Sequence, residues 1–200
     1  MNDLILSWVE TFVMSPIFFP ALAVFVIGDC LFPLLPSESV INLAGAWSGS
    51  HDGKPWVWGI FIAATIYGMI GDNILYFAGR MFADKVSQFP KGSKPEKALR
   101  WAKRNVRNND VAAIIIGRFI PWARWVLTLF LGSTRYPWRK FFPIDTIGMM
   151  VWAGQATLVG YVGGWLFQRQ PLIGLVTGLV AGGIIGTFLQ WFLKRGVAEA

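Results

Sequence analysis

GRFIPWARW, residues 117–125, places two arginines and a proline inside an otherwise apolar region. VAAIII precedes it and VLTLFLG follows, so Arg118 and Arg124 flank Pro121 where a continuous hydrophobic helix would be expected. Proline lacks a backbone donor and disrupts the interior of a helix. A charged side chain in a bilayer costs at least about 2.5 kcal/mol. The segment therefore indicates an interrupted helix whose arginines face a cavity.

The composition is typical of a membrane protein. Of the 200 residues, 54% are hydrophobic and 14% are charged, whereas soluble domains average roughly 25% charged residues. A membrane-spanning helix takes ~20 residues, and residues 59–79, 144–167 and 171–193 are long enough and apolar enough for one each. The single cysteine and single histidine provide neither a disulfide framework nor a zinc-ligand set. No metal or other cofactor is expected.

Basic residues indicate the topology. From Arg80 to Asp110 the chain holds nine basic residues against three acidic ones, and the loop before residue 143 and the C-terminal tail are also basic. Such clusters at segment ends are typical of cytoplasmic loops, and they do not indicate nucleic-acid binding. If all three segments are cytoplasmic, the region 111–134 begins and ends on the same side. It is then expected to form a re-entrant hairpin with its break at Pro121.

The N-terminal half contains a second proline break in GDCLFPLLPSES, residues 28–39. Asp29 and Glu38 lie on either side of Pro33 and Pro36. On an unbroken helix nine residues turn by about 900°, which would place the two carboxylates on opposite faces. A proline-broken hairpin can instead bring them together. Charge parity predicts that this hairpin opens to the exterior.

The predicted fold is an all-α polytopic membrane protein built as an inverted repeat, in which each half has a proline-broken re-entrant hairpin followed by a transmembrane helix. A further transmembrane helix follows at the C-terminus. Broken helices in such repeats build a substrate site near the membrane midplane. The single domain, 1–200, comprises a helix at about 3–15, the first hairpin at 16–48, a span at 56–80, a basic amphipathic linker at 84–110, the second hairpin at 111–134, and spans at 143–167 and 171–193.

Charged residues within membrane segments mark substrate or ion pathways. Arginine offers paired donors to phosphate or carboxylate oxygens, so Arg118 and Arg124 are the expected phosphate-binding residues. Asp29 and Glu38 are the expected proton-coupling carboxylates, because a buried carboxylate can exchange protons near neutrality. Asp72 is a candidate for the same cavity, or else it hydrogen-bonds a neighbouring helix. The alternative for the whole set is that acids and arginines only pair with each other.

Three further features are interpreted structurally. Asp145 follows Pro143 at the expected start of a span, where an acid favours the helix dipole. The linker 84–110 suits either a helix on an anionic leaflet or a solvated loop. Small residues recur every four positions in the last span and suit close packing within the chain or in a homo-oligomer; they are Gly174, Gly178, Gly182 and Gly186.

Four segments together, GRFIPWAR, FPLLPSES, GDNILYFAGR and the basic linker, resemble the DedA family of bacterial membrane proteins, part of the wider VTT or SNARE-associated Golgi protein superfamily. The resemblance covers about residues 16–168. It implies functional roles for Asp29, Glu38, Arg118 and Arg124. Asp29 stands where family members usually have glutamate, and Trp122 stands where a small or polar residue is common.

The resemblance implies lipid movement across the bacterial cytoplasmic (inner) membrane, driven by the proton motive force. Recycling of undecaprenyl phosphate and flipping of phospholipids are associated with bacterial members, and eukaryotic relatives act as lipid scramblases. The predicted function is therefore a flippase for a phosphate-headed lipid, with that anionic lipid and protons as its partners. The linker and the C-terminus are expected in the cytoplasm.

Two alternatives have different requirements. A proton-coupled exporter of small solutes or cations would need the carboxylates but not the arginines. A non-transporting scaffold for envelope assembly would use the glycine-lined face and the basic surface instead. An enzyme is not expected, since the membrane segments provide no catalytic set of histidines, cysteines or metal ligands.

Overall fold

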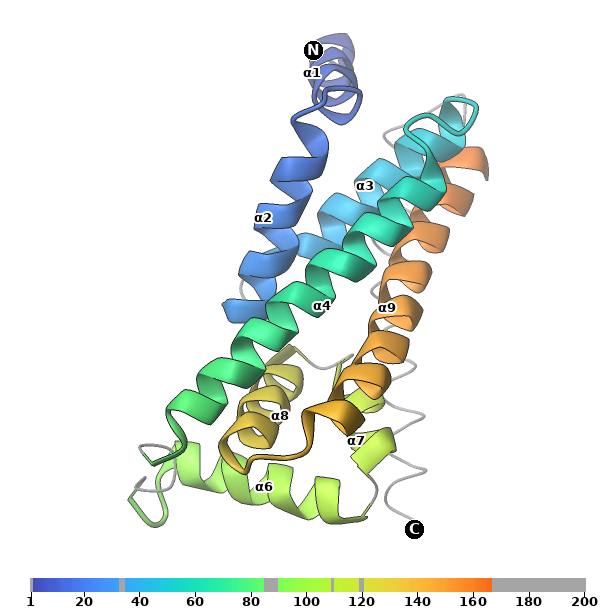
Figure 1. Cartoon of the computed structure of the whole chain (residues 1–200). Coiled ribbons are helices and arrows are strands. Elements are labelled where there is room, and N and C mark those ends of the chain that lie inside the picture. The colour runs from blue at the N-terminus through green and yellow to red at the C-terminus, as the bar shows by residue number, and fades with distance from the viewer. Residues whose placement is uncertain (1, 33–34, 85–89, 109, 119–120, 167–200) are drawn as a thin grey trace.

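The computed structural model describes residues 2–32, 35–84, 90–108, 110–118 and 121–166, and the regular secondary structure of these residues is helical (Figure 1). This confirms the all-α class. The predicted span 171–193, its four glycines and Pro33 lie outside the described residues. The helices are α1 (Asn2–Val13), α2 (Phe18–Leu31), α3 (Ser37–Ser50), α4 (Val57–Met81), α6 (Lys94–Asn108), α7 (Asp110–Gly117), α8 (Pro121–Ser133) and α9 (Trp138–Leu166).

The long helix α4 is central to the arrangement and contacts α2, α8 and α9. Its 25 residues extend about 37 Å, which exceeds the ~30 Å of a hydrocarbon core. Over a span length its mean hydropathy is 1.5, and among the described helices it is the one that reaches the length and apolarity of a span by itself. Taken together, α1 and α2 also reach the length and apolarity of a span between Ser7 and Leu31, but the two helices are bent by 85° at their junction.

Helix α9 begins at Trp138, earlier than the predicted span start at residue 143. Pro143 lies within the helix, which continues through it; a proline removes one backbone donor without ending a helix that tertiary contacts support. Asp145 is consequently the eighth residue of α9 and not a residue of its first turn. The helix-dipole interpretation of Asp145 is therefore wrong. Although long enough to cross a membrane, α9 falls short of the mean hydropathy of α4.

Two helix pairs are interrupted beside prolines. The first break lies between Leu31 and Ser37, with Pro36 directly before α3; the second lies between Gly117 and Pro121, the first residue of α8. Proline suits the start of a helix because the first amides have no intrahelical acceptor. In Figure 1, α2 runs toward the middle of the molecule and α3 returns to the end where α1 lies, whereas α7 and α8 leave from and return to the opposite end.

Two crossings bring helix backbones into direct contact. A Cβ atom built on Gly49 of α3 would overlap the carbonyl oxygen of Tyr161 of α9, and one on Gly164 would overlap that of Ala46. Helices α4 and α8 meet in the same way, where a Cβ on Gly132 would overlap the carbonyl oxygen of Tyr76. In both crossings, a helix that follows a break packs on the long helix of the other half. Glycine is required at these positions by the close approach.

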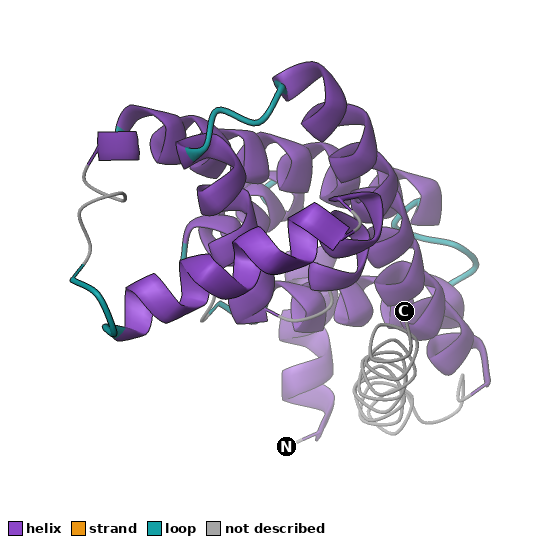
Figure 2. Ribbon diagram, turned by 90° about the horizontal axis from the view of Figure 1, so that it is seen from below, coloured by secondary structure: helices purple, strands orange, loops and turns teal. Residues whose placement is uncertain are grey.

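Helix α6 lies across one end of the bundle, as Figures 1 and 2 show from two directions. Its apolar stripe faces α8, with Ala102 fully buried beside Leu127 and Phe130. The exposed side of the helix is basic, and Arg100 pairs there with Glu96 at 2.6 Å. Since α6 docks on protein through its apolar stripe, its charged side is left outward.

Candidate functional site

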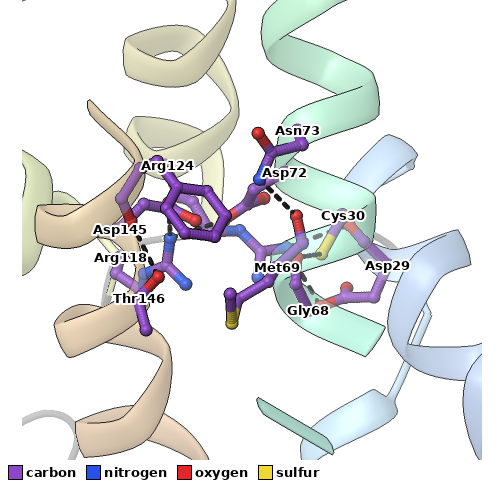
Figure 3. Close-up of polar contacts among 11 residues, drawn as sticks. Asp29, Cys30, Gly68, Met69, Asp72, Asn73, Arg118, Arg124, Asp145 and Thr146 are labelled. Atoms are coloured by element: carbon purple, nitrogen blue, oxygen red, sulfur yellow. Dashed lines mark hydrogen bonds and ion pairs between the residues drawn. The ribbon is translucent and has the colours of Figure 1, made fainter. Parts of the chain in front are cut away.

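Charged side chains from separate parts of the chain meet inside the bundle, between the two helix breaks (Figure 3). Arg118 lies in the turn directly after α7 and reaches both long helices. Its Nη2 donates to Asp72 Oδ2 of α4 at 2.5 Å and also to Asp145 Oδ1 of α9. The Arg118 side chain is 1% exposed and both carboxylates are 0% exposed. One guanidinium nitrogen thus joins two fully buried carboxylates.

Glycine makes room for this cluster on α9. Gly148 lies one turn beyond Asp145, and a Cβ atom there would be 3.1 Å from Arg118 Nε. Some buried polar atoms of the cluster have no hydrogen-bond partner among the described residues. They are Arg118 Nε and Nη1, Asp72 Oδ1 and Asp145 Oδ2. An incompletely satisfied buried ion cluster gains little stability. The cluster is therefore a candidate functional site.

Arg124 joins the start of α8 to the first helix break. Its Nη2 donates to the backbone carbonyl of Asp29 at 3.0 Å and to Asp29 Oδ2 at 3.1 Å. Ser37, the first residue of α3, donates from its hydroxyl to the same carboxylate oxygen at 2.9 Å. Trp125 Nε1 donates to the carbonyl of Leu31 at 3.0 Å. The end of α2 is thereby held by α3 on one side and by α8 on the other.

Glu38 is brought near this group but is not joined to it. It lies in the first turn of α3, half-buried, within electrostatic reach of Asp29. Within the described ranges Glu38 forms no hydrogen bond or ion pair, whereas Asp29 is paired with Arg124. The structure thus places the two expected coupling carboxylates close together and pairs one of them with an arginine.

Asp145 is the site residue that sequence reasoning missed. Its signal was present, since FPIDTIGMM places an acid in an apolar run just as MIGDNILYF does for Asp72. The helix start was assigned to Pro143, and this gave Asp145 a capping role that it does not have. The structure places Asp72, predicted either to share the site of the arginines or to hydrogen-bond a neighbouring helix, in an ion pair with Arg118.

Both arginines are closed off by protein in this conformation. Arg118 is 4% exposed and Arg124 is 5% exposed, and each faces carboxylates. The pairing of acids with arginines, weighed as an alternative from the sequence, is what the structure contains. Both guanidinium groups are closed to solvent, so an incoming anion reaches them only after the surrounding protein moves.

A pocket of about 330 Å³ lies away from this cluster, at the end of the bundle near α1 and the α3–α4 connection. Its lining includes Glu10, Trp47, His51 and Lys54. The rings of Trp47 and His51 stack with centroids 4.2 Å apart. Neither Arg118 nor Arg124 lines it, so the pocket does not open directly onto the buried ion pairs.

The apolar composition and the all-helical bundle are consistent with a helical membrane protein. The VTT domain matches residues 35–162, a range that runs from the first helix break to near the end of α9 and contains both arginines. The chain belongs to the VTT domain family, which confirms the resemblance seen in the sequence.

Several relatives are named as bacterial membrane proteins. The chain is 27% identical over 167 residues to the inner membrane protein YohD of Escherichia coli, covering 81% of this chain and 85% of that protein. It is 30% identical over 175 residues to the uncharacterized membrane protein Mb2670 of Mycobacterium bovis, covering 82% and 79%. It is 24% identical over 179 residues to Protein DedA of Escherichia coli, covering 86% and 80%. No solved structure matches the chain.

Proposed function

We propose that this protein is a lipid translocase, a flippase that moves a phosphate-headed lipid such as undecaprenyl phosphate or a phospholipid across the bacterial cytoplasmic membrane. The observation that carries the proposal is the burial of Arg118 and Arg124 beside a helix break, each held by carboxylates from other helices. A phosphate offers several strong acceptor oxygens to such donors. Membership of a membrane-protein family supports the setting.

The carboxylates bind the arginines when no phosphate is bound. Arg124 is the guanidinium that a headgroup reaches first, because its partner Asp29 is 15% exposed while the partners of Arg118 are fully buried. When the phosphate takes the place of Asp29, that carboxylate loses its cation and becomes easier to protonate. Glu38, close to Asp29, joins in this proton exchange. Binding of the lipid headgroup is thereby coupled to the proton gradient.

The two interrupted helix pairs provide alternating access. We take α2–α3 and α7–α8 as re-entrant hairpins that enter from opposite membrane faces, which their opposite directions in Figure 1 support. We assign the α6 end to the cytoplasm and the α3–α4 connection to the outside, which the positively charged linker supports. Movement of one hairpin relative to the other then exposes the arginines to one leaflet at a time.

Reconstitution in liposomes tests this function. Purified protein is expected to move a labelled phosphate-headed lipid faster with a pH gradient than without one, and Arg118→Lys and Arg124→Lys are expected to lose transport because lysine keeps the charge but not the planar fork. Arg100→Lys, an exposed substitution on α6, serves as the matched control. Helix content by circular dichroism verifies folding.

The same experiment separates the alternatives. An exporter of small solutes would remain active with both lysine variants and fail when the carboxylates are replaced. A scaffold would show no lipid movement in the wild type while its variants still support envelope assembly in cells. Either result would exclude the flippase.

A further inference from the structure

The cluster of Asp72, Arg118 and Asp145 has an imbalance of charge. Two carboxylates face one guanidinium, and none of the three side chains is more than 1% exposed. If both acids were ionised, one negative charge would be uncompensated at a fully buried position. Burial of an unpaired ion costs several kcal/mol even after relaxation, and in practice such a group takes up a proton.

The geometry brings the two acids within reach of each other. Asp72 Oδ2 and Asp145 Oδ1 both accept from Arg118 Nη2. Two oxygens that share a nitrogen are separated by at most two hydrogen-bond lengths, or roughly 6 Å. Carboxylates this close cannot both ionise readily, and such pairs hold one proton between them. Each acid also has a second oxygen without a partner among the described residues, Asp72 Oδ1 and Asp145 Oδ2.

Neighbouring charges do not remove the imbalance. Arg124 of α8 is within electrostatic reach of both acids, but it is hydrogen-bonded to Asp29 of α2. Among the described residues, a further titratable neighbour is the buried thiol of Cys30 on α2, which donates to the carbonyl of Gly68. Counting Asp29 and Arg124 with the cluster gives three acids and two arginines, so one negative charge is still in excess.

We propose that Asp72 and Asp145 form a proton-binding site in which the pair shares one proton while Arg118 neutralises the remaining charge. The site is separate from the Asp29 and Glu38 pair. A second proton makes both acids neutral and leaves Arg118 as an unpaired cation, which then requires an anion. This step rests on the proposed function, in which the incoming anion is the lipid phosphate. Uptake of the second proton adds a positive charge, and binding of the phosphate by Arg118 balances it.

Infrared spectroscopy of the purified protein tests the proton site without reference to transport. A protonated carboxylic acid has a C=O stretch distinct from that of a carboxylate. Wild type at neutral pH is expected to show this band, and Asp72→Asn and Asp145→Asn are each expected to lose it. Each variant keeps one carboxylate and one guanidinium, a neutral pair, so charge gives no reason for it to unfold. Circular dichroism verifies this.

Glu96→Gln is the matched control for the infrared measurement. The hydrogen bond from Arg100 and the one from the Gly92 amide lower the pKa of the exposed Glu96, so this acid is ionised at neutral pH and its removal leaves the band unchanged. A wild type without the band at neutral pH would overturn the proposal. So would a band of full strength in both aspartate variants.

A binding titration tests the link to Arg118. A water-soluble, short-chain phosphatidic acid is titrated into the protein in two buffers of different ionisation enthalpy, which reveals protons taken up on binding. Wild type is expected to take up protons and Asp145→Asn to take up fewer. Equal uptake by both would overturn the coupling. If the wild type does not bind the lipid at all, the proposed function fails while the infrared result still decides the proton site.

Discussion

Arg124 and Asp29 lie 95 positions apart in the sequence and join the two helix breaks, since the guanidinium binds both the backbone carbonyl and the carboxylate of Asp29. This pair links the start of α8 to the end of α2, and Ser37 extends the link to α3. The arginine therefore contacts backbone as well as side chain at the opposite break. Its position depends on the fold of both halves of the chain.

Replacement of Asp29 by asparagine is expected to weaken this link without abolishing it. The backbone acceptor remains, so the loss is that of one charge-assisted hydrogen bond, about 1.5–3 kcal/mol before allowance for partial exposure. Transport driven by a pH gradient should fall more than thermal stability in detergent. Ser37→Ala removes a neutral hydrogen bond of about 1 kcal/mol and should have the smaller effect on both. Equal transport by Asp29→Asn and wild type would contradict a role for this pair.

Gly148→Ala should displace the Arg118 side chain. The added methyl group lies 3.1 Å from Nε, which forces the guanidinium to shift from its two carboxylates. Lipid transport in liposomes is expected to decrease severalfold while the protein stays helical. Gly154→Ala on the same helix is the control, because its methyl group meets Phe61 at an ordinary 3.4 Å. Similar activities of the two variants would show that Arg118 tolerates the shift.

Gly132→Ala and Gly49→Ala should destabilise the bundle. Each added methyl group would overlap a backbone carbonyl of the facing helix, which cannot move as a side-chain end can. Overpacking costs typically about 1–3 kcal/mol, and contacts between backbones leave little room to relax. Thermal unfolding in detergent should show a lower midpoint for both variants than for Gly154→Ala. An unchanged midpoint would mean that these crossings open easily.

Single cysteines at His51 and Lys94 test the orientation. His51 precedes α4 on the α3–α4 connection, and Lys94 is the first residue of α6, which follows α4 in the chain. The native Cys30 is 1% exposed, so it can remain in place without reacting. A membrane-impermeant maleimide applied to intact cells should label position 51, whereas position 94 should react after permeabilisation. Labelling of both positions from outside would contradict the proposed topology.

The sequence predicted the two helix breaks because prolines in apolar runs are strong local signals. The breaks beside Pro36 and Pro121 follow from such signals, whereas Arg118 and Arg124, expected to face a cavity, are buried by protein. The partners of the arginines depend on tertiary packing and could not be read in this way. Charge alone did not indicate that Arg118 would bind Asp72 and Asp145 while Arg124 bound Asp29.

The error at Asp145 has a specific physical cause. Pro143 was taken as a helix start, although a proline in the second turn is compatible with a helix that α3, α4 and α7 support from the sides. Once the helix begins at Trp138, Asp145 belongs to the interior. The close crossings of α3 with α9 and of α4 with α8 were also missed, since glycines in a membrane helix do not reveal which helix they face.

The glycine crossings tie α3 to α9 and α4 to α8 through their backbones. Because helices in backbone contact leave little room to deform, each pair is expected to move as a unit. Asp145 lies on the first pair and Asp72 on the second, and Arg118 in the turn after α7 binds both. Separation of the two pairs would therefore break at least one ion pair of Arg118.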